Sequence, residues 1–327
     1  MRRLSEDAYV AGIQAGDRLI LSRAITLVES QREKDVVLAQ QVLGRLTHQT
    51  ERTTIRIGIT GSPGVGKSTF IEAFGKYLTS IGKKVAVLAV DPSSQRTKGS
   101  IMGDKTRMEE LVKDPLAYIR PSASGSTLGG VARKTRESIL LCEAAGYEVI
   151  IVETVGVGQS EVAVKEMTDF FLLLMLAGAG DELQGIKKGI MEMTDAIAIT
   201  KADGDNVKQA KRARVEYLTA LHLFPANPSG WIPKVLTCSA LENQHIDQVW
   251  EVMVDFQTKL TTNGWLQKNR EAQNLHWMHD TIKERLITEF YQHARVQQVL
   301  ANIEHEVASG QQPAYAAALK LLNLFKY

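Results

Sequence analysis

Eight residues in the first quarter of the chain have the types and spacing of a phosphate-binding loop. Residues 61–68 read Gly-Ser-Pro-Gly-Val-Gly-Lys-Ser, a complete G-x-x-x-x-G-K-[ST] pattern. In such a loop the glycines let backbone N–H groups converge on an anion, and the helix that follows adds partial positive charge. Lys67 would reach the β- and γ-phosphates of a nucleotide, and the Ser68 hydroxyl would ligate Mg²⁺. The predicted phosphate-binding residues are Gly61, Ser62, Pro63, Gly64, Val65, Gly66, Lys67, Ser68 and Thr69.

A second motif indicates which base the nucleotide carries. Residues 200–203 read Thr-Lys-Ala-Asp after an apolar run, which resembles the [NT]-K-x-D guanine motif. The Asp203 carboxylate would accept hydrogen bonds from the N1–H and the exocyclic amine of guanine, a pair of donors that adenine does not offer. The aliphatic stem of Lys201 would cover the face of the base. Thr200 stands where asparagine is commoner, and we expect this replacement to loosen the bracing of the phosphate loop.

A short element after the last predicted strand completes the base site. It resembles the Ser-Ala element whose backbone N–H groups contact guanine O6, although by itself so short an element means little. Its residues are Ser239, Ala240 and Leu241.

Acidic residues beyond the ends of predicted strands supply candidate metal ligands. Mg²⁺ prefers oxygen ligands and usually keeps some of its waters. Ser68, with carboxylates drawn from Asp91, Asp104 and Glu153, matches that preference. Asp91 is also the candidate for orienting the attacking water, which makes Lys67 and Asp91 the predicted catalytic pair.

The elements that must position these residues alternate along the middle of the chain. Short β-rich runs are separated by helical patterns, which predicts a mostly parallel sheet with helices on both faces, the α/β fold of P-loop NTPases. Ligands in such sheets bind at the carboxyl ends of the strands, where the motifs lie. The predicted strands are residues 55–60, 85–90, 117–120, 149–154, 169–176, 196–200 and 234–239.

Helical patterns flank this central region on both sides. We expect three parts: an N-terminal helical extension over 1–50, a P-loop domain over 51–258 and a C-terminal helical arm over 259–327. The arm carries many apolar residues, more than a small appendage can bury alone. They are Trp265, Leu275, Trp277, Leu286, Phe290, Tyr291, Leu300, Leu319, Leu321, Leu322 and Phe325.

The composition excludes several classes of partner. With 39 Lys and Arg against 37 Asp and Glu, the net charge of +2 indicates neither a nucleic-acid nor an anionic-membrane partner. The most apolar run, residues 170–180, is shorter than the roughly 20 residues that span a bilayer. No apolar stretch follows the N-terminus, and both cysteines lie beside apolar runs. We therefore expect a cytoplasmic protein with free thiols.

Taken in order, the motifs resemble one family closely. They are G-S-P-G-V-G-K-S-T, V-D-P-S-S, G-D-K-T-R-M, E-T-V-G-V-G-Q-S-E and T-K-A-D. This series is similar to the cobalamin-associated GTPases of the MeaB/ArgK type, bacterial counterparts of the human methylmalonic aciduria type A protein. They belong to the SIMIBI class of P-loop GTPases. The resemblance covers most of the chain, and the block with Glu153 where most GTPases carry aspartate is its most specific element.

The resemblance implies a function that spacing alone does not show. Such proteins are homodimers through their C-terminal helices, hydrolyse GTP to GDP with Mg²⁺, and act as chaperones for the adenosylcobalamin-dependent methylmalonyl-CoA mutase by protecting it and gating cofactor loading. It also implies switch segments that respond to the γ-phosphate. The predicted switch residues are Gly156, Gly158, Gln159, Asp181 and Lys188.

Two alternatives remain open on the residues. A P-loop kinase is one, since the family carries an older label as a kinase of a lysine/arginine/ornithine transport system and arginines are available to cover the phosphates. A nickel-type metallochaperone GTPase is the other. That function needs clustered soft or imidazole ligands, and the chain offers only His276-x-x-His279.

Overall fold

The computed structural model describes residues 3–47, 54–90, 108–121, 128–154, 160–178 and 188–326. The chain divides into two compact units, Met1–Glu271 and Ala272–Tyr327, and the division falls inside the long helix α13 (Trp265–Gln292). Within the described residues, no helix is both long and apolar enough to cross a membrane.

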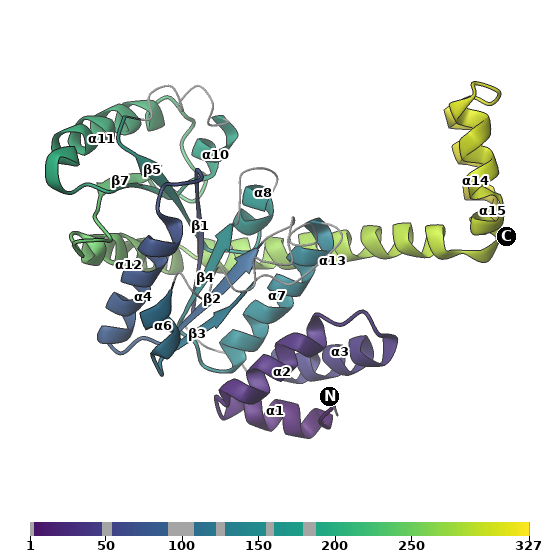
Figure 1. Cartoon of the computed structure of the whole chain (residues 1–327), viewed down its shortest axis with the longest axis horizontal. Helices are drawn as coiled ribbons and strands as arrows, with labels where there is room; N and C mark the ends of the chain where they lie inside the picture. Colours follow the sequence, from purple (N-terminus) through teal and green to yellow (C-terminus); the bar gives the residue numbers. More distant parts are fainter. Residues whose placement is uncertain are drawn as a thin grey trace. The chain divides into compact units, whose positions relative to one another are not determined.

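A seven-stranded parallel sheet forms the centre of the first unit, which confirms the predicted fold class (Figure 1). The strand order is β3-β2-β4-β1-β5-β6-β7, so β1 lies in the middle and β3 and β7 form the two edges. The strands are β1 (Ile55–Gly61), β2 (Val85–Val90), β3 (Ala117–Arg120), β4 (Val149–Thr154), β5 (Phe170–Leu176), β6 (Ala196–Thr200) and β7 (Lys234–Thr237). Strands buried on both faces read as nearly continuous apolar runs, which is why the sequence revealed them.

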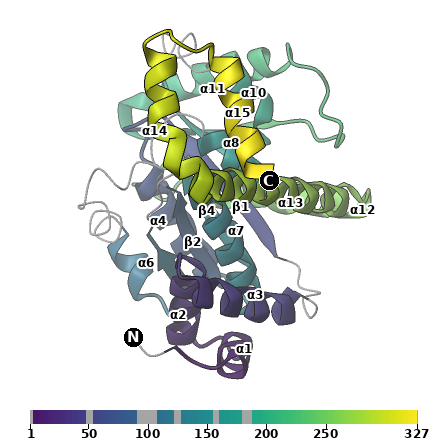
Figure 2. The ribbon, with the colours of Figure 1, turned by 90° about the vertical axis from the view of Figure 1, so that its right-hand side faces the viewer.

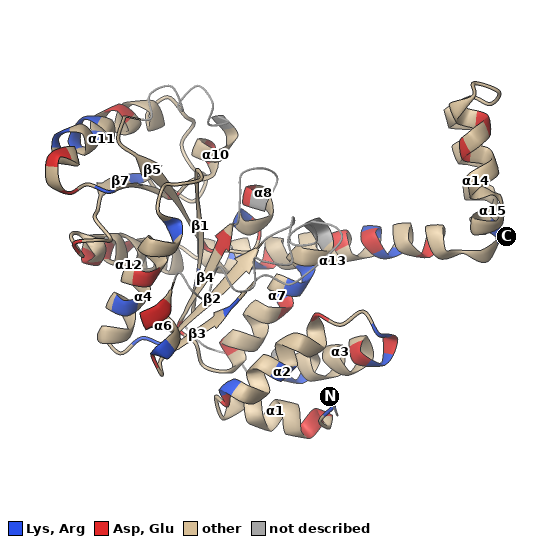
Figure 3. Cartoon of the chain, viewed as in Figure 1, with Lys and Arg blue, Asp and Glu red and all other residues tan. Residues whose placement is uncertain are grey.

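Helices cover both faces of this sheet (Figures 1 and 2). One face packs against α4 (Lys67–Ser80), α6 (Glu109–Lys113) and α12 (Ile246–Thr262) around a core that includes Ile57, Phe74 and Phe170. The other face carries α7, α8, α10 and α11. Their bounds are Leu128–Ala144, Ser160–Lys165, Lys188–Met193 and Val207–Leu221. The outer helices carry charges of both signs, whereas the sheet is mostly uncharged (Figure 3).

Three N-terminal helices, α1 (Glu6–Gln14), α2 (Arg18–Val28) and α3 (Glu33–Thr47), pack on α7. The Asp17 carboxylate caps α2 by accepting from the backbone N–H groups of Leu19 and Ile20. Arg120 at the end of β3 pairs with Glu29 at the end of α2. These contacts attach the N-terminal helices to the edge of the sheet formed by β3.

A buried charge network fixes the amino ends of the central strands. Asp169 is fully buried; it accepts from the Arg56 N–H at 2.9 Å and from Arg270 Nε at 2.8 Å. Arg56 in turn forms two hydrogen bonds to Glu143, at 2.7 and 2.9 Å. Since Arg270 lies in α13, the network attaches the first turns of that helix to the sheet. It also explains why β5 begins at Phe170, one residue later than predicted.

Replacing Asp169 by alanine should destabilise the protein by roughly 3–5 kcal/mol, because it leaves Arg270 without its carboxylate and the Arg56 N–H unpaired. Urea unfolding followed by tryptophan fluorescence measures this loss. Asp255→Ala, an exposed position on α12, is the matched control and should change stability by less than about 0.5 kcal/mol. Equal stability of the two variants would contradict the account.

The C-terminal unit contains the rest of α13 and a pair of helices, α14 (Ala294–Ala308) and α15 (Ala314–Lys326). Of the apolar residues predicted for the arm, Trp265 packs against the core of the first unit, and most of the others divide into two groups. One group, including Phe290, Leu300, Leu321 and Phe325, packs in the core between these helices. The other remains exposed: Leu275, Leu286, Tyr291, Leu319 and Leu322.

Candidate nucleotide-binding site

The phosphate loop lies between the middle strand of the sheet and α4, in the predicted strand–loop–helix arrangement. Gly61 and Gly66 are both required by the backbone. A Cβ on Gly61 would approach the carbonyl oxygen of Leu174 on β5 to 2.6 Å, and Gly66, which precedes α4, has φ +94°. The Val65 side chain is fully buried, so the loop is anchored from within. Its backbone N–H groups and the start of α4 can therefore surround a phosphate.

The ammonium group of Lys67 lies over this loop. Its Nζ donates to the carbonyl oxygen of Gly61 at 2.6 Å and to that of Ser62 at 3.4 Å. Burial lowers the pKa of Lys67, while the nearby carboxylates of Glu153 and Glu161 raise it. A partly buried cation beside converging N–H groups is suited to binding a phosphate dianion. The negative charge of the phosphate would offset the desolvation of the ammonium group.

Ser68 and Glu153 meet beside the loop, as the sequence predicted. Ser68 Oγ lies 3.5 Å from Glu153 Oε1, and Glu153 is buried at the end of β4. A hydroxyl and a carboxylate side by side offer two of the oxygen ligands that Mg²⁺ prefers. When bound there, the ion would neutralise charge on the β- and γ-phosphate oxygens. Asp91 and Asp104, the other predicted ligands, lie outside the described residues, as do the predicted switch residues Gly156, Gly158, Gln159 and Asp181. Lys188 is the first residue of α10.

The guanine motif follows β6, two strands from β1. Asp203 Oδ2 accepts a hydrogen bond from Ser239 Oγ, which joins the two predicted base-binding elements. The element that begins at Ser239 forms a short loop, whose ends are joined by two backbone hydrogen bonds between Ser239 and Gln244, at 2.9 and 3.0 Å. The Leu241 side chain is 81% exposed beside this element.

The guanine motif is bonded directly to the phosphate loop. Thr200 Oγ1 donates to the Val65 carbonyl at 2.7 Å, and Lys201 Nζ donates to the Gly64 carbonyl at 2.9 Å. The expectation that Thr200 loosens the bracing of the loop is therefore wrong, because its hydroxyl is buried and reaches the loop itself. Lys201 also has φ +54°, a conformation that turns the chain sharply after β6.

Replacing Thr200 by valine keeps the shape of the side chain but removes the donor to Val65. A buried carbonyl left without a partner costs about 1–2 kcal/mol, so we expect GDP affinity to fall roughly fivefold to thirtyfold. Thr200→Ser, which retains the hydroxyl, is the control and should bind GDP within about threefold of wild type. Titration calorimetry measures all three; equal affinities would show that the bond does not brace the loop.

Sequence reasoning missed two groups near the loop. Glu161, on the first turn of α8, is buried, and its carboxylate raises the pKa of Lys67. Its place in the E-T-V-G-V-G-Q-S-E block was the available signal. Thr154, after Glu153 on β4, donates to Thr60 Oγ1 at 2.9 Å and ties the carboxyl ends of β4 and β1 together.

With this geometry established, similarity to known proteins assigns the family. The profile of the family described as methylmalonyl Co-A mutase-associated GTPase MeaB matches residues 21–295. The chain belongs to the MeaB family of GTPases. The match includes β1, the phosphate loop, the guanine motif and the Ser239 loop, so it covers the whole candidate site.

Individual relatives of the MeaB family extend over nearly the whole chain. A putative GTPase of Caulobacter vibrioides is 51% identical over 323 residues, and the alignment covers 98% of this chain and 98% of that protein. The mitochondrial methylmalonic aciduria type A homolog of Mus musculus is 46% identical over 329 residues, which cover 98% of this chain and 79% of that protein. Among solved structures, a protein titled LAO/AO transport system kinase is 38% identical, with a TM-score of 0.78 over 100% of this chain and 99% of that one.

Proposed function

We propose that this protein is a cytoplasmic, Mg²⁺-dependent GTPase that hydrolyses GTP to GDP and phosphate. The observation that carries the proposal is the direct bonding of the guanine motif to the phosphate loop through Thr200 and Lys201. A loop that binds phosphates and a carboxylate suited to guanine are thereby held in one rigid arrangement. Membership of the MeaB family supports the same assignment.

Each part of the site has a separate role in this reaction. Backbone groups of residues 61–69 bind the phosphates, Lys67 stabilises charge that develops on them, and Ser68 and Glu153 hold the metal ion. From the sequence, Asp91 orients the attacking water and Asp104 completes the metal site. Asp203 and Lys201 bind guanine, assisted by the backbone of Ser239, Ala240 and Leu241. Burial raises the pKa of Cys238 beside this loop to about 12, so its thiol stays neutral.

We further propose that the client is the adenosylcobalamin-dependent methylmalonyl-CoA mutase, as the family description suggests. GTP would order the switch segments that contain Gly156, Gly158, Gln159, Asp181 and Lys188, and the ordered and disordered states would differ in affinity for the mutase. A client that distinguishes the two states must, by linkage, change nucleotide affinity in return. Hydrolysis would then time protection of the mutase and loading of its cofactor.

The test of this coupling uses purified mutase. Its presence should change GTP affinity roughly fivefold to 150-fold and should raise the rate of hydrolysis. Asp181→Ala and Lys188→Ala should keep GTP affinity within a few-fold and lose the stimulation, whereas Lys208→Ala on α11 is the control and should keep it. An unstimulated wild-type enzyme would contradict the client, and stimulation retained in both variants would contradict the role of this loop.

We also propose a homodimer through the C-terminal unit. On the described part of α13 beyond residue 271, Leu275, Met278, Ile282, Leu286 and Ile287 are between 48% and 59% exposed. An apolar surface of this extent marks a protein interface. Light scattering at micromolar concentration should give twice the monomer mass of 36.1 kDa. A monomer mass would contradict the proposal.

A further inference from the structure

The edge of the sheet formed by β3 has backbone groups available for pairing. Among the strands that the structure describes, β3 pairs with β2 alone, and the Val85 N–H donates to the Leu116 carbonyl. In a parallel ladder alternate residues bond the same neighbour, so Tyr118 and Arg120 face β2 and Ile119 faces outward. The Ile119 N–H and C=O have no hydrogen-bond partner among the described residues. Such groups on an edge strand are a template for an added strand.

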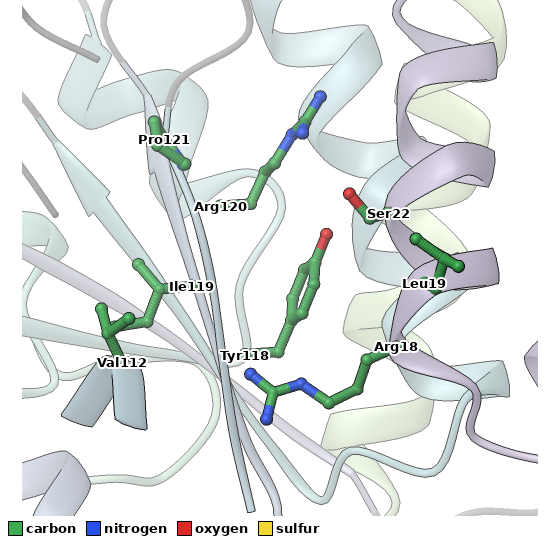
Figure 4. Close-up of a pocket in the computed structure, with 8 residues that line it drawn as sticks. All are labelled: Arg18, Leu19, Ser22, Val112, Tyr118, Ile119, Arg120 and Pro121. Atoms are coloured by element: carbon green, nitrogen blue, oxygen red, sulfur yellow. The ribbon is translucent and has the colours of Figure 1, made fainter. Parts of the chain in front are cut away.

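A pocket of about 330 Å³ surrounds this edge (Figure 4). Tyr118 and Arg120 project from one side of β3, toward α2, and Ile119 projects from the other side, toward Val112 of α6 (Figure 4). Side chains on the two faces of a strand can line the same pocket only where the pocket passes around an edge of that strand that no other strand covers. The lining residues are Arg18, Leu19, Ser22, Val112, Tyr118, Ile119, Arg120 and Pro121.

The pocket combines apolar walls with one uncompensated positive charge. Leu19 lines the pocket and is 66% exposed. Arg120 is paired with Glu29, so its charge is compensated. Arg18 donates to the backbone carbonyl of Asp114 at 3.3 Å and has no carboxylate partner among the described residues. An occupant that complements these walls carries a carboxylate beside an apolar group.

We propose that the edge of β3 binds an extended acidic segment of the client protein. The backbone of the segment pairs with Ile119, a carboxylate meets Arg18, and an apolar side chain lies against Leu19. The proposal rests on the client proposed above. Since β3, β2 and β4 lie between the added segment and β1, the segment docks roughly 19 Å from β1, at about 4.8 Å per strand, and leaves the phosphate loop open. The client would thus hold the GTPase domain without covering its nucleotide.

The experiment measures binding of purified mutase by biolayer interferometry with a non-hydrolysable GTP analogue. Arg18→Glu should weaken binding by roughly tenfold or more, because it places a negative charge opposite the carboxylate. Arg212→Glu, the same charge change on exposed α11, is the control and should stay within about twofold. Ile119→Pro removes the outward N–H and also the isoleucine side chain, which packs against the core, so it is compared with Ile119→Ala, which keeps the N–H. The proline variant should bind more weakly than the alanine variant. GDP affinity and melting temperature, measured in parallel, should stay unchanged in both arginine variants.

A photo-crosslinking amino acid at Leu19 identifies the occupant. It should capture a mutase peptide that contains aspartate or glutamate, whereas the same group at Val215, 60% exposed on α11, should not. If wild type binds mutase, Arg18→Glu binds it equally and Leu19 captures nothing, the proposal is wrong. If wild type does not bind mutase, both the client and its docking on β3 are contradicted.

Discussion

Replacing Lys67 by alanine is expected to lower GTP turnover by at least about a hundredfold. Lys67 Nζ lies 2.6 Å from the Gly61 carbonyl, and no other side chain of the described residues donates to that carbonyl. Charge develops on the phosphoryl oxygens in the transition state, and removal of a preorganised donor from such a site costs roughly 10²–10³ in rate. The loss should appear mainly in kcat, since the backbone N–H groups still bind the phosphates.

Phosphate release under saturating GTP and Mg²⁺ measures this effect. Lys76→Ala is the matched control, because Lys76 lies on the same helix, is 46% exposed and pairs only weakly with Asp114 at 3.6 Å. Its turnover should match wild type within about twofold. A Lys67→Ala variant with more than about a tenth of wild-type turnover would remove Lys67 from the catalytic residues.

The second large effect concerns the base. Asp203→Asn should lower GDP affinity by at least about a hundredfold and raise affinity for xanthosine diphosphate. The two hydrogen bonds from guanine to a charged acceptor contribute roughly 1.5–3 kcal/mol each, and an amide cannot accept both. The amide can donate instead to the extra carbonyl of xanthine. Its oxygen can still accept from Ser239 Oγ, so the two base-binding elements stay joined.

Competition calorimetry with GDP, xanthosine diphosphate and ADP tests the exchange. Asp205→Asn is the control, since Asp205 is exposed on the 3-10 helix Gly204–Asn206 that follows the motif. It should keep the wild-type preference. If Asp203→Asn binds GDP as tightly as wild type does, the guanine assignment is wrong.

The sequence predicted the sheet closely because its strands are buried on both faces. Four predicted strands, residues 85–90, 117–120, 149–154 and 196–200, match the structure residue for residue. The last strand ends at Thr237 rather than at residue 239, because Ser239 pairs with Gln244 instead of continuing the ladder. Whether the backbone of a residue bonds a neighbouring strand or its own loop depends on contacts that local patterns do not encode.

The sequence predicted which residues form the site, but it did not predict the hydrogen bonds that connect them. The roles of Lys67 and Asp203 were proposed from motifs, whereas the bonds from Thr200 and Lys201 to the phosphate loop join residues 135 and 137 positions apart. The expectation for Thr200 was wrong because it compared side chains without knowing which carbonyl lay within reach. Likewise, periodicity could not divide the apolar residues of the C-terminal helices between a helix-pair core and an exposed surface.

The central claim is that this chain hydrolyses GTP with Mg²⁺ and discriminates against ATP. The most direct measurement is steady-state phosphate release by the purified wild-type protein from GTP and from ATP, each with Mg²⁺ and with a chelator. We predict GTP turnover of ~10⁻⁴–10⁻² s⁻¹, the range of GTPases without a stimulating partner, lost on chelation and at least about tenfold faster than ATP turnover. Equal rates for the two nucleotides, hydrolysis that survives chelation, or a basal rate above about 1 s⁻¹ would contradict the account.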